Sequence, residues 1–201
     1  MEHNRTHLPY RSWCQHCVRG WGQSRDHRKL QSAKDRIVPH VVMDYCFLGA
    51  EGDESTAPIL VVKDTSTRRI FTIPVPSKGI VSEFPARQLH NSICLLGHRK
   101  VVLKTDGEPA IIAVSNSVKE RCSQVDIIPE NSVTGDSASN GEAENANKLV
   151  QNQVRTMYDA LKARFSPLEV PSDHPTLKWL IMFSGSLLTR FMVGSDGKTA
   201  F

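Results

Sequence analysis

The order of strand-like and helix-like segments constrains the fold more than any other feature of this sequence. Three segments rich in β-branched and aromatic residues come first, at 38–48, 58–62 and 69–75. Helical and strand patterns then alternate, with helices expected at 82–96, 109–122 and 143–165 and strands at 101–106 and 125–128. Three strands in series followed by alternating helices and strands predict a mixed α/β fold.

The third strand-like segment belongs at an edge of this sheet. It contains Pro74 and is followed by Pro76, and a proline has no N–H to donate to a neighbouring strand. The first three strands then form a meander, so the fourth strand is expected on the free side of the first. This arrangement would place Asp44, within the first strand, next to Asp106, which ends the fourth.

Composition and charge divide the chain into three regions. Residues 1–36 are polar and carry eight basic and three acidic side chains, so the excess behind the net charge of +4 is confined to this Cys- and His-containing arm. Residues 37–166 hold the alternating pattern, and residues 167–201 are a proline-rich link and one more helix. A basic arm on a neutral body indicates a polyanion partner, although a solubilising tail gives the same pattern.

The chain has the composition of a globular protein, with 39% hydrophobic and 23% charged residues. The longest apolar run near its end, 179–183, is far too short to cross a bilayer. The first residues do not resemble a signal peptide. We therefore expect a protein that is neither embedded in a membrane nor secreted.

Three carboxylates are expected to converge at one end of the sheet. Asp44 and Asp106 lie on neighbouring strands, and Glu144 lies in the first turns of the helix 143–165, on the edge that faces the sheet. Carboxylates held close together repel one another unless cations neutralise them, and oxygen ligands favour Mg²⁺ or Mn²⁺. A pair of such ions can activate the attacking oxygen and stabilise the leaving oxygen of a phosphodiester. Solvated surface acids and a turn-capping Asp are the alternative interpretation.

The segments around these acids resemble one protein family. Segment 139–148, SNGEAENANK, is similar to the Gly-x-x-Glu…Asn-Lys/Arg segment of the integrases of long-terminal-repeat retrotransposons and retroviruses, and its Asn-Gly-x-Ala-Glu part to copia-type elements. Other motifs of that family resemble VMD at 42–44, LVVKDTS at 60–66, KTDGEP at 104–109 and GSDGKTAF at 194–201. The 37 residues between Asp106 and Glu144 are close to the family's usual separation of the last two acids.

The resemblance implies an RNase H-like fold, in which a five-stranded mixed sheet is flanked by helices. It also implies a polynucleotidyl transferase or endonuclease of the DDE type, expected here as a fragment of a retrotransposon polyprotein. Asp44, Asp106 and Glu144 would be its catalytic residues and its Mg²⁺ or Mn²⁺ ligands. Such enzymes hydrolyse the ends of element DNA and then use the freed 3′-hydroxyl to attack a target phosphodiester. The implied partners are double-stranded DNA and further copies of the chain, in a nuclear or cytoplasmic nucleoprotein particle.

Polar residues continue the face of Glu144 along the predicted helix. They are Asn147, Lys148, Gln151 and Arg155. Amides and cations that follow an acid along one helix face suit a duplex backbone lying beside the helix. For Lys148, which also matches the family motif, we favour DNA contact. For Gln151 and Arg155, a solvated face of an amphipathic helix is an equal alternative.

Cys14 and Cys17 form a C-x-x-C pair, which is half of a typical zinc site. The family's N-terminal module uses two histidines followed by two cysteines, but only six residues separate His7 from Cys14, far fewer than in the family pattern. We therefore expect zinc ligands His7, Cys14, Cys17 and His27, with His16 or His3 as substitutes. The alternative is a remnant of the module with reduced thiols.

The remaining cysteines and histidines stand singly in the sequence. Cys46, Cys94 and Cys122 each lie inside an apolar segment, where a free cysteine usually behaves as a small buried hydrophobe. His90 and His98 are expected on the surface or at helix caps. Besides an integrase or its idle copy, the sequence leaves one function of another class open, a zinc-dependent interaction module on an α/β scaffold.

Overall fold

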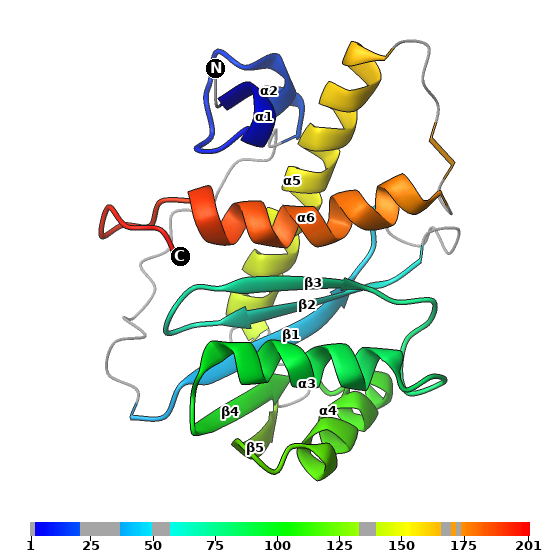
Figure 1. Ribbon diagram of the computed structural model, residues 1–201, viewed down its shortest axis with the longest axis vertical. Coiled ribbons are helices and arrows are strands. Elements are labelled where there is room, and N and C mark those ends of the chain that lie inside the picture. Colours follow the sequence, from blue (N-terminus) through cyan, green and yellow to red (C-terminus); the bar gives the residue numbers. More distant parts are fainter. Residues whose placement is uncertain (1–2, 21–36, 50–56, 133–139, 166–169, 172–173) are drawn as a thin grey trace.

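The computed structural model describes residues 3–20, 37–49, 57–132, 140–165, 170–171 and 174–201. A five-stranded sheet crosses the centre of the molecule in the order β3-β2-β1-β4-β5 (Figure 1). Its strands are β1 (His40–Cys46), β2 (Ile59–Asp64), β3 (Ile70–Pro74), β4 (Lys100–Thr105) and β5 (Asp126–Asn131). β1, β2 and β3 pair antiparallel as a meander, and β4 runs parallel to both β1 and β5. The predicted mixed sheet, with its third strand at an edge, is confirmed.

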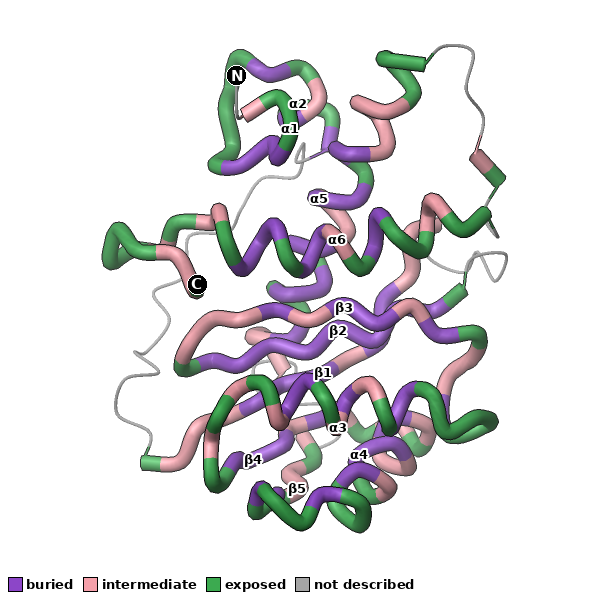
Figure 2. The backbone as a smooth tube through the Cα atoms, in the orientation of Figure 1, coloured by how far each residue is buried: buried purple, intermediate pink, exposed green. Residues whose placement is uncertain are grey.

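Two helices cover each face of the sheet (Figure 1). α3 (Phe84–Leu96) and α4 (Pro109–Arg121) lie on one face, and α5 (Gly141–Arg164) and α6 (Pro175–Phe191) lie on the other. Side chains alternate along the strands between two cores: Val41, Met43 and Tyr45 face α3 and α4, whereas Cys46 faces α5 and α6. Figure 2 shows this burial on the strands and on the inner sides of the helices.

Local signals in the sequence explain where the helices begin and end. Pro85, Pro109 and Pro175 lie in the first turns of α3, α4 and α6, where a proline costs no intrahelical hydrogen bond. α3 stops at Gly97, whose φ of 74° is the left-handed conformation that glycine adopts freely. The long apolar stripe predicted for α5 is buried through Ala143, Ala146, Val150, Val154 and Met157.

Two boundaries differ from the sequence prediction. β4 ends at Thr105, so Asp106 follows the strand instead of closing it. β5 runs on to Asn131, because Pro129 and Glu130 still pair with Leu103 and Lys104. Pro129 is tolerated there because β5 is the outer strand of the sheet.

Residues 3–20 form a compact module that packs on α5. It contains α1 (His3–Thr6) and α2 (Gln15–Gly20). Leu8 is buried in the core shared with α5 and α6, and Gln153 Nε2 donates a hydrogen bond to the Thr6 carbonyl at 2.7 Å. This part of the predicted arm is therefore folded, whereas residues 21–36 of the arm lie outside the described residues. None of the described helices is long and apolar enough to cross a membrane.

Candidate functional site

Strand register brings Asp44 and Asp106 to the same end of the sheet. β1 and β4 run parallel with Val42 level with Lys104, so two residues further along, Asp44 comes level with Asp106. The Asp44 side chain lies on the α5 face, because Asn147 Nδ2 of α5 donates a hydrogen bond to Asp44 Oδ2 at 2.9 Å. The register thus produces the juxtaposition of two carboxylates that the order of the strands predicts.

The electrostatics of this strand end are unfavourable for a carboxylate without a cation. Burial raises the pKa of Asp44 to about 6, and the negative charges of Asp106 and Glu108 add to this effect. Hydrogen bonds from the Tyr45 N–H, at 2.7 Å, and from Asn147 stabilise the ionised form but do not reverse the shift. The site therefore holds negative charge that its own hydrogen bonds do not compensate.

Glu144 lies in the first turn of α5, one turn before Asn147, and its side chain is exposed. In the described part of the chain, the groups with three or more ligand atoms all within 4.8 Å of one another consist of Cys and His, and Asp44, Asp106 and Glu144 do not form such a group. The structure thus brings Asp44 and Asp106 level at one end of the sheet and leaves Glu144 exposed on α5.

Sequence reasoning missed two ion pairs near these acids. Lys78 Nζ lies 2.8 and 2.9 Å from the carboxylate oxygens of Glu108, and above the rings of Tyr45 and Phe47. The Glu108 N–H donates to Asp106 Oδ1 at 3.1 Å, so this ion pair is joined directly to the acidic site. The position of Glu108 two residues after Asp106 was the only signal for it in the sequence.

The second ion pair lies between β2 and the start of α5. Lys63 Nζ is 2.5 Å from Glu142 Oε2, and both side chains are largely buried. Lys63 pairs with Val42 across the β1–β2 ladder, two residues before the level of Asp44. This contact ties the first turn of α5, and with it Glu144, to the sheet.

The four predicted DNA-contact residues divide into two groups. Asn147 and Gln151 point toward the end of β1, where Asn147 contacts Asp44 and Gln151 Nε2 donates to the Phe47 carbonyl at 2.8 Å. Arg155 is exposed and its Nη2 lies 3.4 Å from the Leu48 carbonyl. Lys148 is exposed on the same helix. The amides thus position α5 against β1, and the two cations remain open to solvent.

A second cluster of chemically active side chains lies in the N-terminal module. His3, His7, Cys14 and Cys17 each offer a ligand atom, and these atoms all lie within 4.8 Å of one another. Cys14 Sγ is 3.5 Å from His7 Nδ1, and Cys17 Sγ is 3.6 Å from His3 Nε2. Two sulfurs and two imidazole nitrogens are a typical ligand set for tetrahedral Zn²⁺.

The surroundings of this cluster favour a neutral imidazole. Burial lowers the pKa of His7 to about 4, with further lowering by His16 and His3, so the ring is unprotonated at neutral pH. Burial raises the pKa of the Cys17 thiol to about 11, so an adjacent cation is needed for it to ionise. A dication would offset this cost, and the residues fit zinc.

The cluster contains three of the predicted ligands and one of the two substitutes. His7, Cys14 and Cys17 come together, and His3 offers the fourth ligand atom. His16 is held elsewhere, with its Nδ1 2.5 Å from Asp159 Oδ2 on α5. His27 lies outside the described residues. α1 is a single turn, so His3 and His7 lie on the same side of the module.

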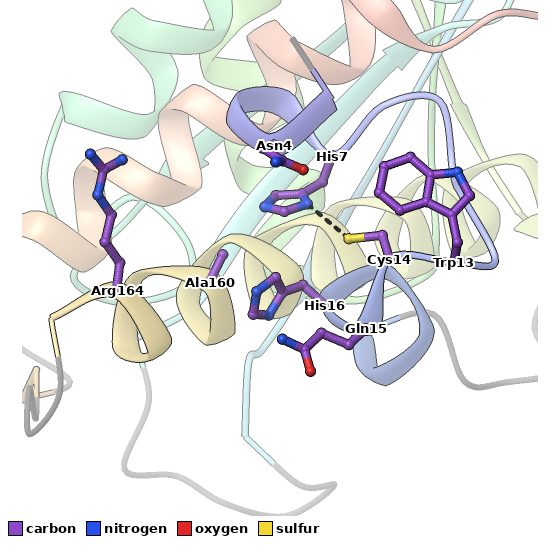
Figure 3. A pocket seen from close by; sticks show the side chains of 8 residues that line it. All are labelled: Asn4, His7, Trp13, Cys14, Gln15, His16, Ala160 and Arg164. Atoms are coloured by element: carbon purple, nitrogen blue, oxygen red, sulfur yellow. Dashed lines mark hydrogen bonds between the residues drawn. The ribbon is translucent and has the colours of Figure 1, made fainter. Parts of the chain in front are cut away.

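A pocket of about 550 Å³ opens beside this cluster (Figure 3). Residues of the module line one side, with Ala160 and Arg164 of α5 opposite, as the side chains drawn in Figure 3 show. His7 and Cys14 reach the pocket from the metal-ligand cluster. Asp44 and Asp106 do not line it, so the pocket belongs to the N-terminal module and not to the acidic site.

No family model and no curated protein matches this chain. Solved structures match at low sequence identity. The catalytic core domain of BIV integrase is 16% identical with a TM-score of 0.51, over 80% of this chain and 90% of its own. The HTLV-2 integrase catalytic core in complex with magnesium, in its dimeric form, is 17% identical with a TM-score of 0.52, over 82% of this chain and 95% of its own.

A chain from a larger assembly matches over more of the sequence. It belongs to the simian T-cell lymphotropic virus intasome in complex with the PP2A regulatory subunit B56 gamma, and it is 15% identical with a TM-score of 0.60. The match covers 93% of this chain but only 61% of that chain, so this chain spans less than two thirds of its length. At these identities the comparisons establish the architecture: the chain has the RNase H-like fold of retroviral integrase catalytic cores, with a five-stranded mixed sheet flanked by helices.

Proposed function

We propose that this chain performs metal-dependent phosphodiester hydrolysis and DNA strand transfer, as the catalytic core of a retrotransposon-type integrase. The observation that carries the proposal is the juxtaposition of Asp44 and Asp106 at one sheet end of an integrase-core fold. Asn147, which lies one turn after Glu144 on α5, donates a hydrogen bond to Asp44. The copia-like segment 139–148 supports an origin in a retrotransposon.

In this proposal, Asp44, Asp106 and Glu144 hold Mg²⁺ or Mn²⁺. The carboxylates fit such an ion, because burial and the neighbouring acids disfavour the charge on Asp44 and a cation would relieve that cost. When bound, the ions would supply activation of the attacking oxygen and stabilisation of the leaving oxygen. The HTLV-2 core is described in complex with magnesium, which supports the same choice here.

The residues around the acids would position them and the DNA. Asn147 holds Asp44 through its amide, and the Lys63–Glu142 pair fixes the start of α5. Lys148 and Arg155 are exposed on α5 and would contact phosphates of the duplex backbone. Because these contacts are electrostatic, DNA affinity should fall steeply with salt concentration.

The N-terminal module would bind Zn²⁺ through His3, His7, Cys14 and Cys17. There the ion would hold α1 and α2 together, in a segment too short to form its own apolar core. The full particle would contain several copies of the chain. The HTLV-2 core is described in dimeric and trimeric forms, and the simian viral match is an intasome, which supports this part of the proposal.

The test is DNA joining by the full chain. A short duplex with a free 3′-hydroxyl is incubated with supercoiled plasmid and Mn²⁺ or Mg²⁺, and joined products are quantified. We expect Asp44→Asn, Asp106→Asn and Glu144→Gln each to lower joining by at least about 100-fold, because each removes a ligand from ions that contribute several kcal/mol to the transition state. Asp126→Asn, at the start of β5 with its carboxylate on Lys100, is the control and should join normally.

Three outcomes separate the alternatives. Equal joining by Asp106→Asn and the unchanged chain would overturn the catalytic role. Salt-dependent DNA binding by the unchanged chain without joining, in either metal, would identify an idle DNA-binding copy. Zinc binding without DNA binding would leave the interaction module as the better description.

A further inference from the structure

A second group of metal-ligating side chains lies on the opposite face of the sheet from Asp44. His90 and Cys94 are one turn apart on α3, and Cys122 is the residue that caps the C-terminus of α4. Their ligand atoms all lie within 4.8 Å of one another. Cys94 Sγ is 3.7 Å from His90 Nε2. Two helices that are separate in sequence thus deliver an imidazole and two thiols to one point.

The surroundings orient these groups as ligands. His90 Nδ1 lies 3.4 Å from Asn91 Oδ1, an acceptor, so a ring with its proton on Nδ1 directs the free lone pair of Nε2 toward Cys94. Cys122 is buried, and His90 and Cys94 are partly exposed, so solvent reaches one side of the group. Gln124 Oε1 lies 3.9 Å from Cys94 Sγ on that side.

The acidic site does not use this group, because Asp44 faces α5 whereas α3 and α4 cover the other face. Nor does the N-terminal cluster, which packs on α5. Burial raises the pKa of the Cys94 thiol, and the adjacent Cys122 thiol adds to the shift. A pair of thiols packed together in this way gains from a dication that stabilises their thiolates.

We propose that His90, Cys94 and Cys122 form a second zinc site, with its fourth position open to water or to the Gln124 side chain. Two thiolates and one imidazole are ligands that select Zn²⁺ over Mg²⁺. On binding, each thiol releases its proton to solvent and forms a sulfur–metal bond, with no change in oxidation state. The ion would connect the last turns of α3 to the end of α4.

The test is the zinc content of the full chain, measured by mass spectrometry of the metal after purification with Zn²⁺ under reducing conditions. We expect His90→Ala, Cys94→Ser and Cys122→Ser each to lose one zinc ion per chain relative to the unchanged protein. Cys46→Ala removes a buried cysteine that belongs to neither cluster and should lose none. Each variant is compared with the unchanged protein, and both contain the same N-terminal cluster. The difference in zinc content therefore does not depend on whether that cluster binds zinc.

A spectroscopic measurement keeps the test decisive if Cys122→Ser folds poorly. In protein loaded with Co²⁺, the thiolate-to-metal absorption should decrease in His90→Ala and Cys94→Ser, whose side chains are partly exposed, with circular dichroism confirming the fold. Unchanged zinc content and absorption in both variants would overturn the proposal.

Discussion

Asp64, the last residue of β2, is charged although its side chain is fully buried. Its carboxylate accepts hydrogen bonds from Ser66 Oγ at 2.7 Å, from Thr67 Oγ1 at 2.6 Å and from His98 Nε2 at 2.8 Å. Burial alone would raise the pKa of Asp64, but the bonds from Thr67, His98 and Ser66 outweigh burial and lower it. The carboxylate therefore holds together the turn into β3 and the segment before β4.

We expect Asp64→Ala to lower the free energy of unfolding by about 2–4 kcal/mol at pH 7, measured by urea denaturation, because several donors lose a buried charged acceptor. The effect should depend on pH. Because the pKa of Asp64 is lower in the folded state, ionised Asp64 stabilises the fold at pH values above its unfolded-state pKa of about 3.9. This stabilisation is lost as the pH falls through the folded-state pKa. The difference between the variant and the unchanged protein should therefore shrink in acid.

Asp126→Ala is the matched control for Asp64→Ala. Its carboxylate pairs with Lys100 at 3.0 Å, but 62% of the side chain is exposed. Removal of this surface pair should change the unfolding free energy by less than about 1 kcal/mol at every pH. Equal losses in the two variants would show that the buried hydrogen bonds of Asp64 contribute nothing beyond its charge.

At the scale of residues, the sequence identifies candidate metal ligands that lie close together in the chain. It does not identify residues that meet only after distant segments have packed together. Cys14 and Cys17 are recognisable because their spacing is itself a signal. His90 and Cys94 have helical i, i+4 spacing that could have been noticed, but Cys122 joins them only because α3 and α4 pack side by side. His98, which follows the C-cap Gly97 of α3, contacts the buried Asp64 at the end of β2, and nothing in the local sequence signals that contact. Such contacts depend on tertiary packing.

At the scale of elements, α6 protects the outer edge of β3. The Ile70 N–H donates to Thr189 Oγ1 at 3.1 Å, and Thr189 Oγ1 lies 3.2 Å from the Ile70 carbonyl oxygen. Thr72 Oγ1 donates to the Ile181 carbonyl at 2.6 Å. An edge strand exposes unpaired backbone groups that can pair with a strand of another chain. α6 shields the edge of β3 from such pairing.

Gly185 permits the close approach of α6 to β3. A Cβ at this position would lie 2.8 Å from Thr72 Oγ1 and 3.1 Å from the Ile70 carbonyl oxygen. We expect Gly185→Ala to lower the free energy of unfolding by about 1–2 kcal/mol, because overpacking outweighs the gain of up to about 1 kcal/mol in helix propensity. Chemical denaturation with circular dichroism measures the difference.

Ser186→Ala, on the exposed side of the same helix, serves as the control for Gly185→Ala. It should change stability by no more than about 0.5 kcal/mol. A Gly185→Ala variant that is more stable than the unchanged protein would mean that the helix can move away from β3 without cost, contrary to the packing described above.

The elements were predictable because their patterns are long or are bounded by proline and glycine. The edge position of β3 followed from Pro74, and the end of α3 from Gly97. Short polar elements were not predictable. α1 and α2 have too few residues for a hydrophobic period, and their order depends on Leu8 in the α5–α6 core and on contacts with α5. The same dependence on distant residues explains why Glu108 was missed.

At the scale of the whole molecule, the N-terminal module and the RNase H-like fold form one packed unit. Contacts that join the module to α5 include Gln153 with the Thr6 carbonyl, His16 and Arg19 with Asp159, and Gly20 with Thr156. A Cβ at Gly20 would lie only 3.1 Å from the Asn152 carbonyl oxygen, so α2 packs directly on the backbone of α5. The C-terminal half of α5 thus has the module as a neighbour in place of solvent.

This arrangement would couple a zinc ion bound by His3, His7, Cys14 and Cys17 to the order of α5. Cys17→Ser removes one of the two thiolates, so the module should lose its metal and much of its folded population. Without the module, the C-terminal half of α5 loses its cover. We expect faster amide hydrogen exchange in residues 3–20 and in the last turns of α5, with little change in β1 to β4, because local opening follows the loss of local contacts.

Asp159→Asn separates docking from metal binding. It weakens the contact with His16, at 2.5 Å, but leaves all four cluster residues in place. The zinc content of Asp159→Asn should therefore stay unchanged. The rate of amide hydrogen exchange in α2 and in the facing turns of α5 should rise, but by a smaller factor than in Cys17→Ser. If Cys17→Ser exposed residues 3–20 without any change in α5, the module would be an independent appendage, and the contacts of Gln153 and Asp159 would not stabilise the helix that also carries Glu144.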